Sequence, residues 1–92
     1  MSDTKSSFSP EDLKRLYWHS RRGMLELDLL LVPFAENCLS GLSADELEMY
    51  RELLREEDQD LFMWLARRCD APSPRLQQII EKILQAKAQE RG

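Results

Sequence analysis

The chain has 92 residues, with 17 acidic and 13 basic side chains and a formal net charge of −4. This length supports one domain with a modest core and leaves no room for a separate substrate-binding lobe or a deep enclosed active site. A net negative charge repels the phosphate backbone of nucleic acids, so the composition disfavours nucleic-acid binding.

No segment of the sequence is typical of export, membrane insertion or metal binding. Residues 1–7 lack the apolar core of a signal peptide and the arginine-rich character of a transit peptide. The longest apolar run, residues 29–34, is far shorter than the ~20 residues that span a bilayer. Cys38, Cys69 and His19 have no metal-ligand spacing, so we interpret the cysteines as reduced residues in the core or at its boundary. We therefore expect a cytoplasmic protein without a bound metal.

Five segments have the periodicity of amphipathic helices, and none alternates like a strand. In the first, Ser9 is placed to cap the helix and Pro10 to occupy its first position. Gly23 is expected to end this helix. The second helix begins near Met24 and is apolar nearly all round, as expected of the central helix of a bundle. Pro33 is expected to kink or shorten it.

Three further helices are predicted after a linker around Gly41. The third opens with a capping box formed by Ser43 and Glu46. Its buried face is expected to hold Leu47, Tyr50, Leu53 and Leu54. Asp58 is predicted to cap the fourth helix, which contains the most aromatic stretch of the chain. The fifth starts at Ser73, and its apolar face consists of Leu76, Ile79, Ile80, Ile83 and Leu84.

Together these segments predict an all-α fold, a compact single-domain five-helix bundle. The helical domain should cover residues 9–87, with residues 1–8 flexible before it and residues 88–92 fraying after it. No internal repeat or low-complexity tract indicates another architecture.

The link between the first two predicted helices contains a glycine between opposite charges. Gly23 can adopt the positive φ that ends a helix. Glu26 falls in the first turn of the next helix, near the positive end of its dipole, and Arg22 is expected to pair with it. These structural roles alone account for the pattern.

The same link also suits a protein-binding surface. Gly23 leaves the backbone bare, so that the main chain of a partner can approach closely. Trp18, Arg21 and Asp28 lie on adjacent turns and would supply an aromatic anchor and a charged rim, which is the composition of interface hot spots. The residues alone leave both interpretations open.

Two segments, taken together and in this order, form a pattern that is more specific than either segment alone. Residues 15–31 contain an RGxxE core, formed by Arg22, Gly23 and Glu26, and residues 58–65 read DQDLFMWL. In this order they resemble the RGxxE signature and the DxDLFxWL segment of the SdhE family, the FAD assembly factors of succinate dehydrogenase. The likeness spans about residues 15–65 and implies a compact five-helix bundle.

The resemblance implies that the chain binds the flavoprotein subunit of succinate dehydrogenase, and of the related fumarate reductase. It would promote covalent attachment of FAD to a histidine of that partner, without being an enzyme and without a stably bound cofactor of its own. The lack of a transit segment favours the bacterial branch, and we expect a monomer with no nucleic-acid or membrane partner. The implied docking patch consists of Trp18, Arg21, Arg22, Gly23, Glu26 and Asp28. Residues expected to support this patch or to touch the partner are Asp60, Phe62 and Trp64, the aromatic pair more in keeping with the core.

Two other functions fit the sequence less well. A helical DNA-binding or antitoxin-like regulator needs a basic recognition helix, whereas Arg67 and Arg68 follow acidic residues and come only at the end of the fourth helix. A small enzyme would have to use His19 or Cys38, yet the chain has no GxSxG, HExxH or glycine-rich phosphate loop. We therefore assign no catalytic residue.

Overall fold

The computed structural model describes residues 8–90 and contains only helices in that part of the chain. The elements are α1 Pro10–His19, α2 Leu25–Cys38, a short 3₁₀ helix η1 Leu39–Gly41, α3 Ala44–Leu54, α4 Asp58–Leu65 and α5 Pro74–Glu90. The predicted all-α fold with five helices is confirmed. The expected flexibility of residues 1–7 and fraying of residues 91–92 lie outside the described residues.

Helix α1 begins as predicted but ends four residues before Gly23. Ser9 and Asp12 form a reciprocal capping box at its start, with hydrogen bonds of 3.0 and 3.2 Å. At its end the Ser20 hydroxyl, which is buried, donates to the carbonyl of Leu16 and shares a hydrogen bond with the hydroxyl of Tyr50 on α3.

The expectation that Gly23 ends α1 is wrong because the backbone has already left the helix. In a continuing helix the Arg22 amide would donate to the carbonyl of Trp18. Instead it donates to the Asp28 carboxylate of α2 at 2.8 Å. Gly23 thus belongs to the link between the helices rather than to the end of the first one.

Helix α2 continues through Pro33 to Cys38, so the expectation that this proline shortens it is wrong. Proline lacks the amide that would bond the carbonyl four residues earlier, which here belongs to Leu29. Leu29 is 55% exposed, so the hydrogen bond is lost on the face of α2 that is turned away from the core.

Helix α3 confirms the predicted capping box, whereas the predicted cap of α4 is wrong. The Ser43 hydroxyl accepts from the Glu46 amide at 3.1 Å, and the Glu46 carboxylate accepts from the Ser43 amide at 3.0 Å. The N-cap of α4 is Glu57, and no side chain caps it. Asp58 is instead the first residue of the helix, and its carboxylate accepts a hydrogen bond from Arg22.

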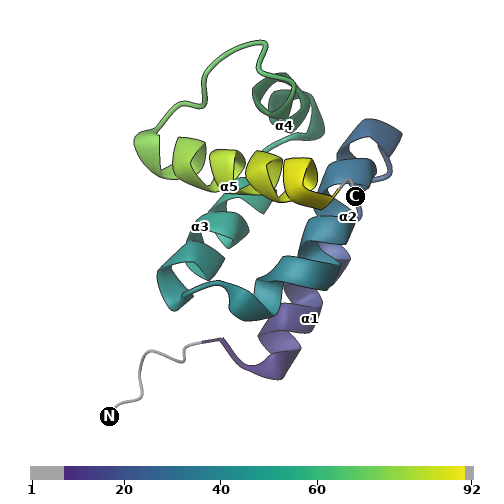
Figure 1. Cartoon of the computed structure of the whole chain (residues 1–92), viewed down its shortest axis with the longest axis vertical. Coiled ribbons are helices and arrows are strands. Elements are labelled where there is room, and N and C mark those ends of the chain that lie inside the picture. The colour runs from purple at the N-terminus through teal and green to yellow at the C-terminus, as the bar shows by residue number, and fades with distance from the viewer. Residues whose placement is uncertain (1–7, 91–92) are drawn as a thin grey trace.

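Helix α5 covers the other helices and closes the core. The Ser73 hydroxyl accepts from the Leu76 amide at 3.2 Å, as expected of a cap, and the helix runs to Glu90, three residues beyond the predicted boundary at 87. Figure 1 shows α5 lying across α3 and reaching α2 at its C-terminal end, and it packs against both. Its buried side chains are Leu76, Ile79, Ile80 and Ile83.

Candidate partner-binding site

The link between α1 and α2 presents a bare glycine to solvent. Gly23 has a φ of +89°, and a β-carbon built at this position meets no atom within 4 Å. Only glycine adopts this backbone conformation without strain, since a side chain clashes with its own backbone there. The space above Gly23 is therefore open, and the choice of glycine follows from the backbone angle and not from crowding.

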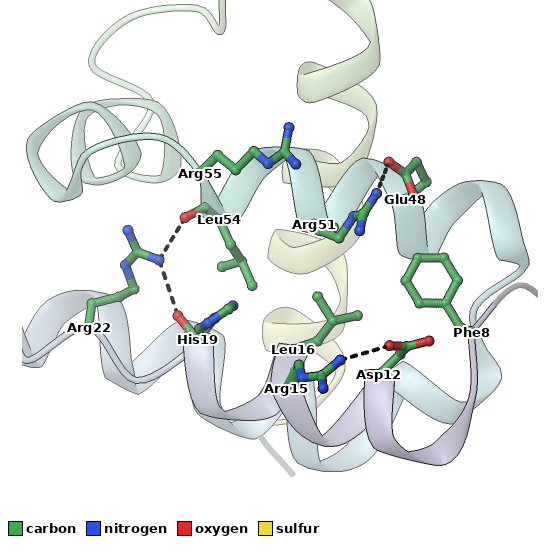
Figure 2. A pocket seen from close by; sticks show the side chains of 10 residues that line it. All are labelled: Phe8, Asp12, Arg15, Leu16, His19, Arg22, Glu48, Arg51, Leu54 and Arg55. Carbon is green, nitrogen blue, oxygen red and sulfur yellow. Dashed lines mark hydrogen bonds and ion pairs between the residues drawn. The ribbon is translucent and has the colours of Figure 1, made fainter.

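Arg22, the neighbour of Gly23, points into the protein. Its side chain is only 15% exposed. Its Nη1 donates to the carbonyl oxygens of His19 at 3.1 Å and Leu54 at 2.8 Å, and its Nη2 donates to that of Glu56 at 2.9 Å. Its Nε donates to the Asp58 carboxylate at 2.8 Å. Figure 2 shows the guanidinium between the ends of α1 and α3.

The position of this guanidinium stabilises three helix ends at once. The last carbonyl groups of a helix have no partner within the helix, and they carry the negative end of its dipole. Arg22 places a cation and two donors at the ends of α1 and α3, whereas Asp58 places an anion at the start of α4. Arg22 is therefore a cross-link between helices that are more than thirty residues apart in the chain.

The expected ion pair between Arg22 and Glu26 is wrong. Arg22 pairs with Asp58, because the guanidinium turns inward to the unpaired carbonyl groups. Glu26 lies exposed in the first turn of α2, and its side chain makes no hydrogen bond or ion pair with another residue of the described part of the chain. Its carboxylate is thus available to a partner.

Asp28 holds the link from the other side. Its carboxylate is half-buried and accepts the hydrogen bond from the Arg22 amide, six residues earlier. The contact fixes the direction in which the chain enters Gly23. Asp28 lies in the first turn of α2, where a negative charge is also favourable for the helix dipole.

Three large apolar side chains near this link are exposed. Trp18 is 61% exposed on α1, and Leu25 and Leu29 are 68% and 55% exposed on α2. Among residues 8–90 the only other exposed large apolar residue is Met63. Leu25 lies in the segment that the sequence indicates as the contact point, whereas Leu29 could not be found from the sequence, because α2 is apolar on all sides and its pattern does not show which side is covered. Their spacing of four residues does put them on one face.

Comparison with known proteins assigns the chain to a family. A sequence model of the family described as "Flavinator of succinate dehydrogenase" matches residues 14–87. The FAD assembly factor SdhE of Pseudomonas aeruginosa is 51% identical over 73 residues, which are 79% of this chain and 87% of the relative. SdhE of Pseudomonas savastanoi pv. phaseolicola is 49% identical over 73 residues (79% and 87%), and SdhE of Vibrio cholerae is 35% identical over 77 residues (84% and 90%).

The chain belongs to the flavinator family of succinate dehydrogenase. As a member of this family it is an FAD assembly factor and not a catalytic enzyme, and the FAD becomes attached to the partner flavoprotein. The predicted family and function are thereby confirmed.

The second motif of this flavinator lies mainly in its core. Trp64 is 9% exposed and belongs to the hydrophobic core, and Phe62 packs against that core from a half-buried position. The guanidinium of Arg68 lies 5.9 Å from the centre of the Phe62 ring. Asp60 is exposed on α4. The two aromatic residues therefore hold α4 in place.

The thiols and the histidine of this flavinator lie apart. Cys38 is half-buried, whereas Cys69 is exposed, so its expected place in the core or at its boundary is wrong. Cys69 follows a turn in which Arg67 has a φ of +59°, and this turn carries the chain away from the core. His19 is exposed at the end of α1. Within residues 8–90 no cluster of His, Cys, Asp or Glu could hold a metal ion, and no helix is long and apolar enough to cross a membrane.

Proposed function

We propose that the chain docks on the flavoprotein subunit of succinate dehydrogenase through one surface and thereby promotes covalent attachment of FAD to that subunit. This docking surface consists of Trp18, Arg21, Gly23, Leu25, Glu26 and Leu29. The observation that carries the proposal is the open Gly23 backbone beside three of the four exposed large apolar side chains of the described residues.

The composition of the docking surface suits a specific protein contact. Trp18, Leu25 and Leu29 offer apolar area that would gain free energy from leaving water. Arg21 and Glu26 supply opposite charges that would fix the orientation of the partner. An aromatic anchor with charged neighbours is the usual composition of an interface hot spot.

Arg22 and Asp28 support this surface without forming it. Their contacts with each other and with α3 and α4 set the path of the backbone on both sides of Gly23. We therefore assign them as positioning residues, which changes the role expected of both Arg22 and Asp28 from contact to support. The support would be indirect for Asp60, Phe62 and Trp64. These residues would fix α4, and α4 binds Arg22 through Asp58.

The proposed mechanism is a shift of population in the partner. The covalent bond forms between FAD and a histidine of the flavoprotein, so the chain need only bind the conformer in which the two are aligned. A protein that binds one conformer better than another raises its population by that difference in affinity. Holding two reacting groups in alignment also removes much of the entropy cost of the reaction.

Three further properties belong to this proposal. The same surface would serve the related flavoprotein of fumarate reductase. The free chain would be a monomer in the bacterial cytoplasm, with no nucleic-acid or membrane partner, and it would hold no FAD stably. The curated relatives named above are bacterial, which supports the cellular setting.

Co-expression of the flavoprotein subunit with variants of the chain tests the proposal. Covalent FAD is read as fluorescence of the subunit band in a denaturing gel. We expect strong fluorescence with the native chain and little with Gly23→Arg, since the new side chain stands where the partner's backbone would lie. Gly41→Arg is the matched control, because Gly41 is also exposed and open but lies at the end of η1, away from the docking surface.

Two results would contradict the proposal. One is equal fluorescence with Gly23→Arg, with the native chain and without any chain. The other is an equal loss with Gly23→Arg and Gly41→Arg, which would show that added charge and bulk act without regard to place. Circular dichroism of each purified variant verifies that it is folded.

A further inference from the structure

A groove of about 490 Å³ lies between α1 and α3, next to the Arg22 cross-link. Figure 2 shows α1 forming one wall and α3 the other. Leu16 and Leu54 line it from opposite sides, and Phe8 stands at the end far from Arg22. Hydrogen bonds of Ser20 with Tyr50 and of Arg22 with Leu54 join the two helices near the end of α1. At the other end of the groove the Arg51 guanidinium lies 5.9 Å from the centre of the Phe8 ring. The groove thus has a narrow apolar floor between charged walls, and it begins at Arg22, next to Gly23.

The rim of the groove is cationic although the whole chain is acidic. Four arginines and two carboxylates line it, and because Asp58 balances the charge of Arg22, the rest of the lining carries an excess of one positive charge in a chain of net charge −4. The guanidinium of Arg22 already donates hydrogen bonds to three backbone carbonyls and to the Asp58 carboxylate. The charge available to a ligand therefore comes from Arg15 on α1 and from Arg51 and Arg55 on α3.

These three arginines are free or only loosely held. Arg55 makes no side-chain hydrogen bond or ion pair with another residue in the range 8–90. Arg15 bonds Asp12 at 3.3 Å and Arg51 bonds Glu48 at 2.9 Å, each through one nitrogen and within its own helix. Such exposed pairs contribute little to stability, so a better ligand displaces them readily. Guanidinium groups bind carboxylates best through two parallel hydrogen bonds, which these contacts do not use.

The spacing of the arginines suits an extended peptide. Arg51 and Arg55 are four residues apart on α3, which places them on one face at a separation of ~6 Å. Alternate side chains of an extended chain point the same way and are ~7 Å apart. Two acidic side chains at alternate positions of an extended segment would thus meet Arg51 and Arg55, while Arg15 faces them from α1.

We propose that this groove receives an acidic, extended segment of the flavoprotein partner. Carboxylates of that segment pair with Arg15, Arg51 and Arg55, and an apolar side chain between them rests on Leu16 and Leu54. The inference rests on the proposed function, and it adds a second contact that is continuous with the docking surface through Arg22. A positive groove on a negative protein also orients the encounter, because only this face attracts the acidic segment.

The test is the salt dependence of binding to the purified flavoprotein subunit. The double variant Arg51→Gln, Arg55→Gln is compared with the native chain by titration calorimetry at 50 and 300 mM NaCl. We expect the variant to raise Kd about tenfold at low salt and to show a weaker dependence on salt, since charged contacts are the part that salt screens. Lys14→Gln with Lys87→Gln is the matched control, because it removes the same charge from exposed positions that do not line the groove.

Each alternative result has a distinct meaning. If the groove variant binds like the native chain at both salt concentrations while Gly23→Arg abolishes binding, the groove inference is overturned and the proposed function stands. If Gly23→Arg also binds and supports FAD attachment normally, the proposed function itself fails. Saturable binding of inorganic pyrophosphate in the groove, not displaced by the flavoprotein subunit, would assign the groove to a small anion and likewise overturn the inference.

Discussion

Arg22 and Gly23 are adjacent in the chain and have opposite exposures. The Arg22 guanidinium lies against the carbonyl groups of two helix ends, whereas Gly23 leaves its backbone open to solvent. The first residue fixes the path of the chain, and the second uses that path to expose main chain beside Trp18 and Leu25. Arg22 of the RGxxE motif is thus turned into the protein, whereas Gly23 is open to solvent.

Substitution of Arg22 should lower the stability of the fold more than is usual for a charged residue in a link between two helices. Arg22→Ala leaves three carbonyl groups and the Asp58 carboxylate without their partner, which we expect to reduce the free energy of unfolding by about 2 to 4 kcal/mol. Urea denaturation followed by circular dichroism measures the change. Arg21→Ala is the control, with an expected effect within ~0.5 kcal/mol because Arg21 is exposed. Equal effects at both positions would contradict the cross-link.

Alanine should lower the free energy of unfolding at Gly23 but not at Gly41. Gly23→Ala forces a side chain into a φ of +89° and should cost about 1 to 2 kcal/mol, although nothing crowds its β-carbon. Gly41→Ala has no positive φ to tolerate and should be neutral or stabilising by up to ~1 kcal/mol. Thermal unfolding of both variants under the same conditions measures the difference. A Gly23→Ala variant as stable as Gly41→Ala would contradict the strained backbone.

At the scale of the element, α2 places a core leucine and a proposed docking leucine two residues apart. Leu27 is fully buried and Leu25 is 68% exposed, because positions two apart in a helix are separated by about 200° and so lie on opposite faces. Leu27→Ala should cost about 2 to 5 kcal/mol through the cavity that it leaves. Leu25→Ala should change stability by less than ~0.5 kcal/mol and yet raise Kd for the flavoprotein subunit about fivefold, or ~1 kcal/mol. Unchanged binding by Leu25→Ala would remove Leu25 from the docking surface.

Helix α3 should lose stability in acid through its capping box. The Ser43 amide, followed by Lys82 at 3.1 Å, holds the pKa of Glu46 below its ordinary value of 4.5. A lowered pKa in the folded state means that the contribution is present above pH ~4.5 and is lost as pH falls through the folded value. Glu46→Gln should therefore be less stable than the native chain at pH 7, and the difference should be smaller at pH 3. Urea titrations at both pH values measure this, and a constant difference would contradict it.

At the scale of the whole molecule, the net charge and the ion pair of Arg67 together argue against the DNA-binding alternative. Arg67 is bound through both terminal nitrogens to Glu81, at 2.9 and 2.8 Å, so one of the two arginines at the end of α4 is already paired. The net charge of −4 opposes approach to a phosphate backbone. We expect no shift of duplex DNA in a gel at 50 mM salt and about 10 µM protein, a concentration that reveals typical non-specific binding. A shift that high salt abolishes would restore the regulator hypothesis.

Much of the fold could be predicted from local patterns. The cap at Ser9, the capping box at Ser43 and the start of α5 after Ser73 appear where the sequence predicted them, because a cap needs only residues three positions apart. The end of α1 and the role of Asp58 could not be predicted in this way. Both depend on Arg22 and Asp28, whose partners lie on other elements.

The sequence by itself determined the helical class, the helix starts and the family, since these depend on periodicity, caps and short motifs that neighbouring residues carry. The tertiary structure decided which face of the motif is available. Arg22 turns inward because unpaired carbonyl groups 32 and 34 residues away need donors, and this leaves Gly23, Glu26 and Leu25 outside. No local pattern contains that information, because it arises only when α1, α3 and α4 meet.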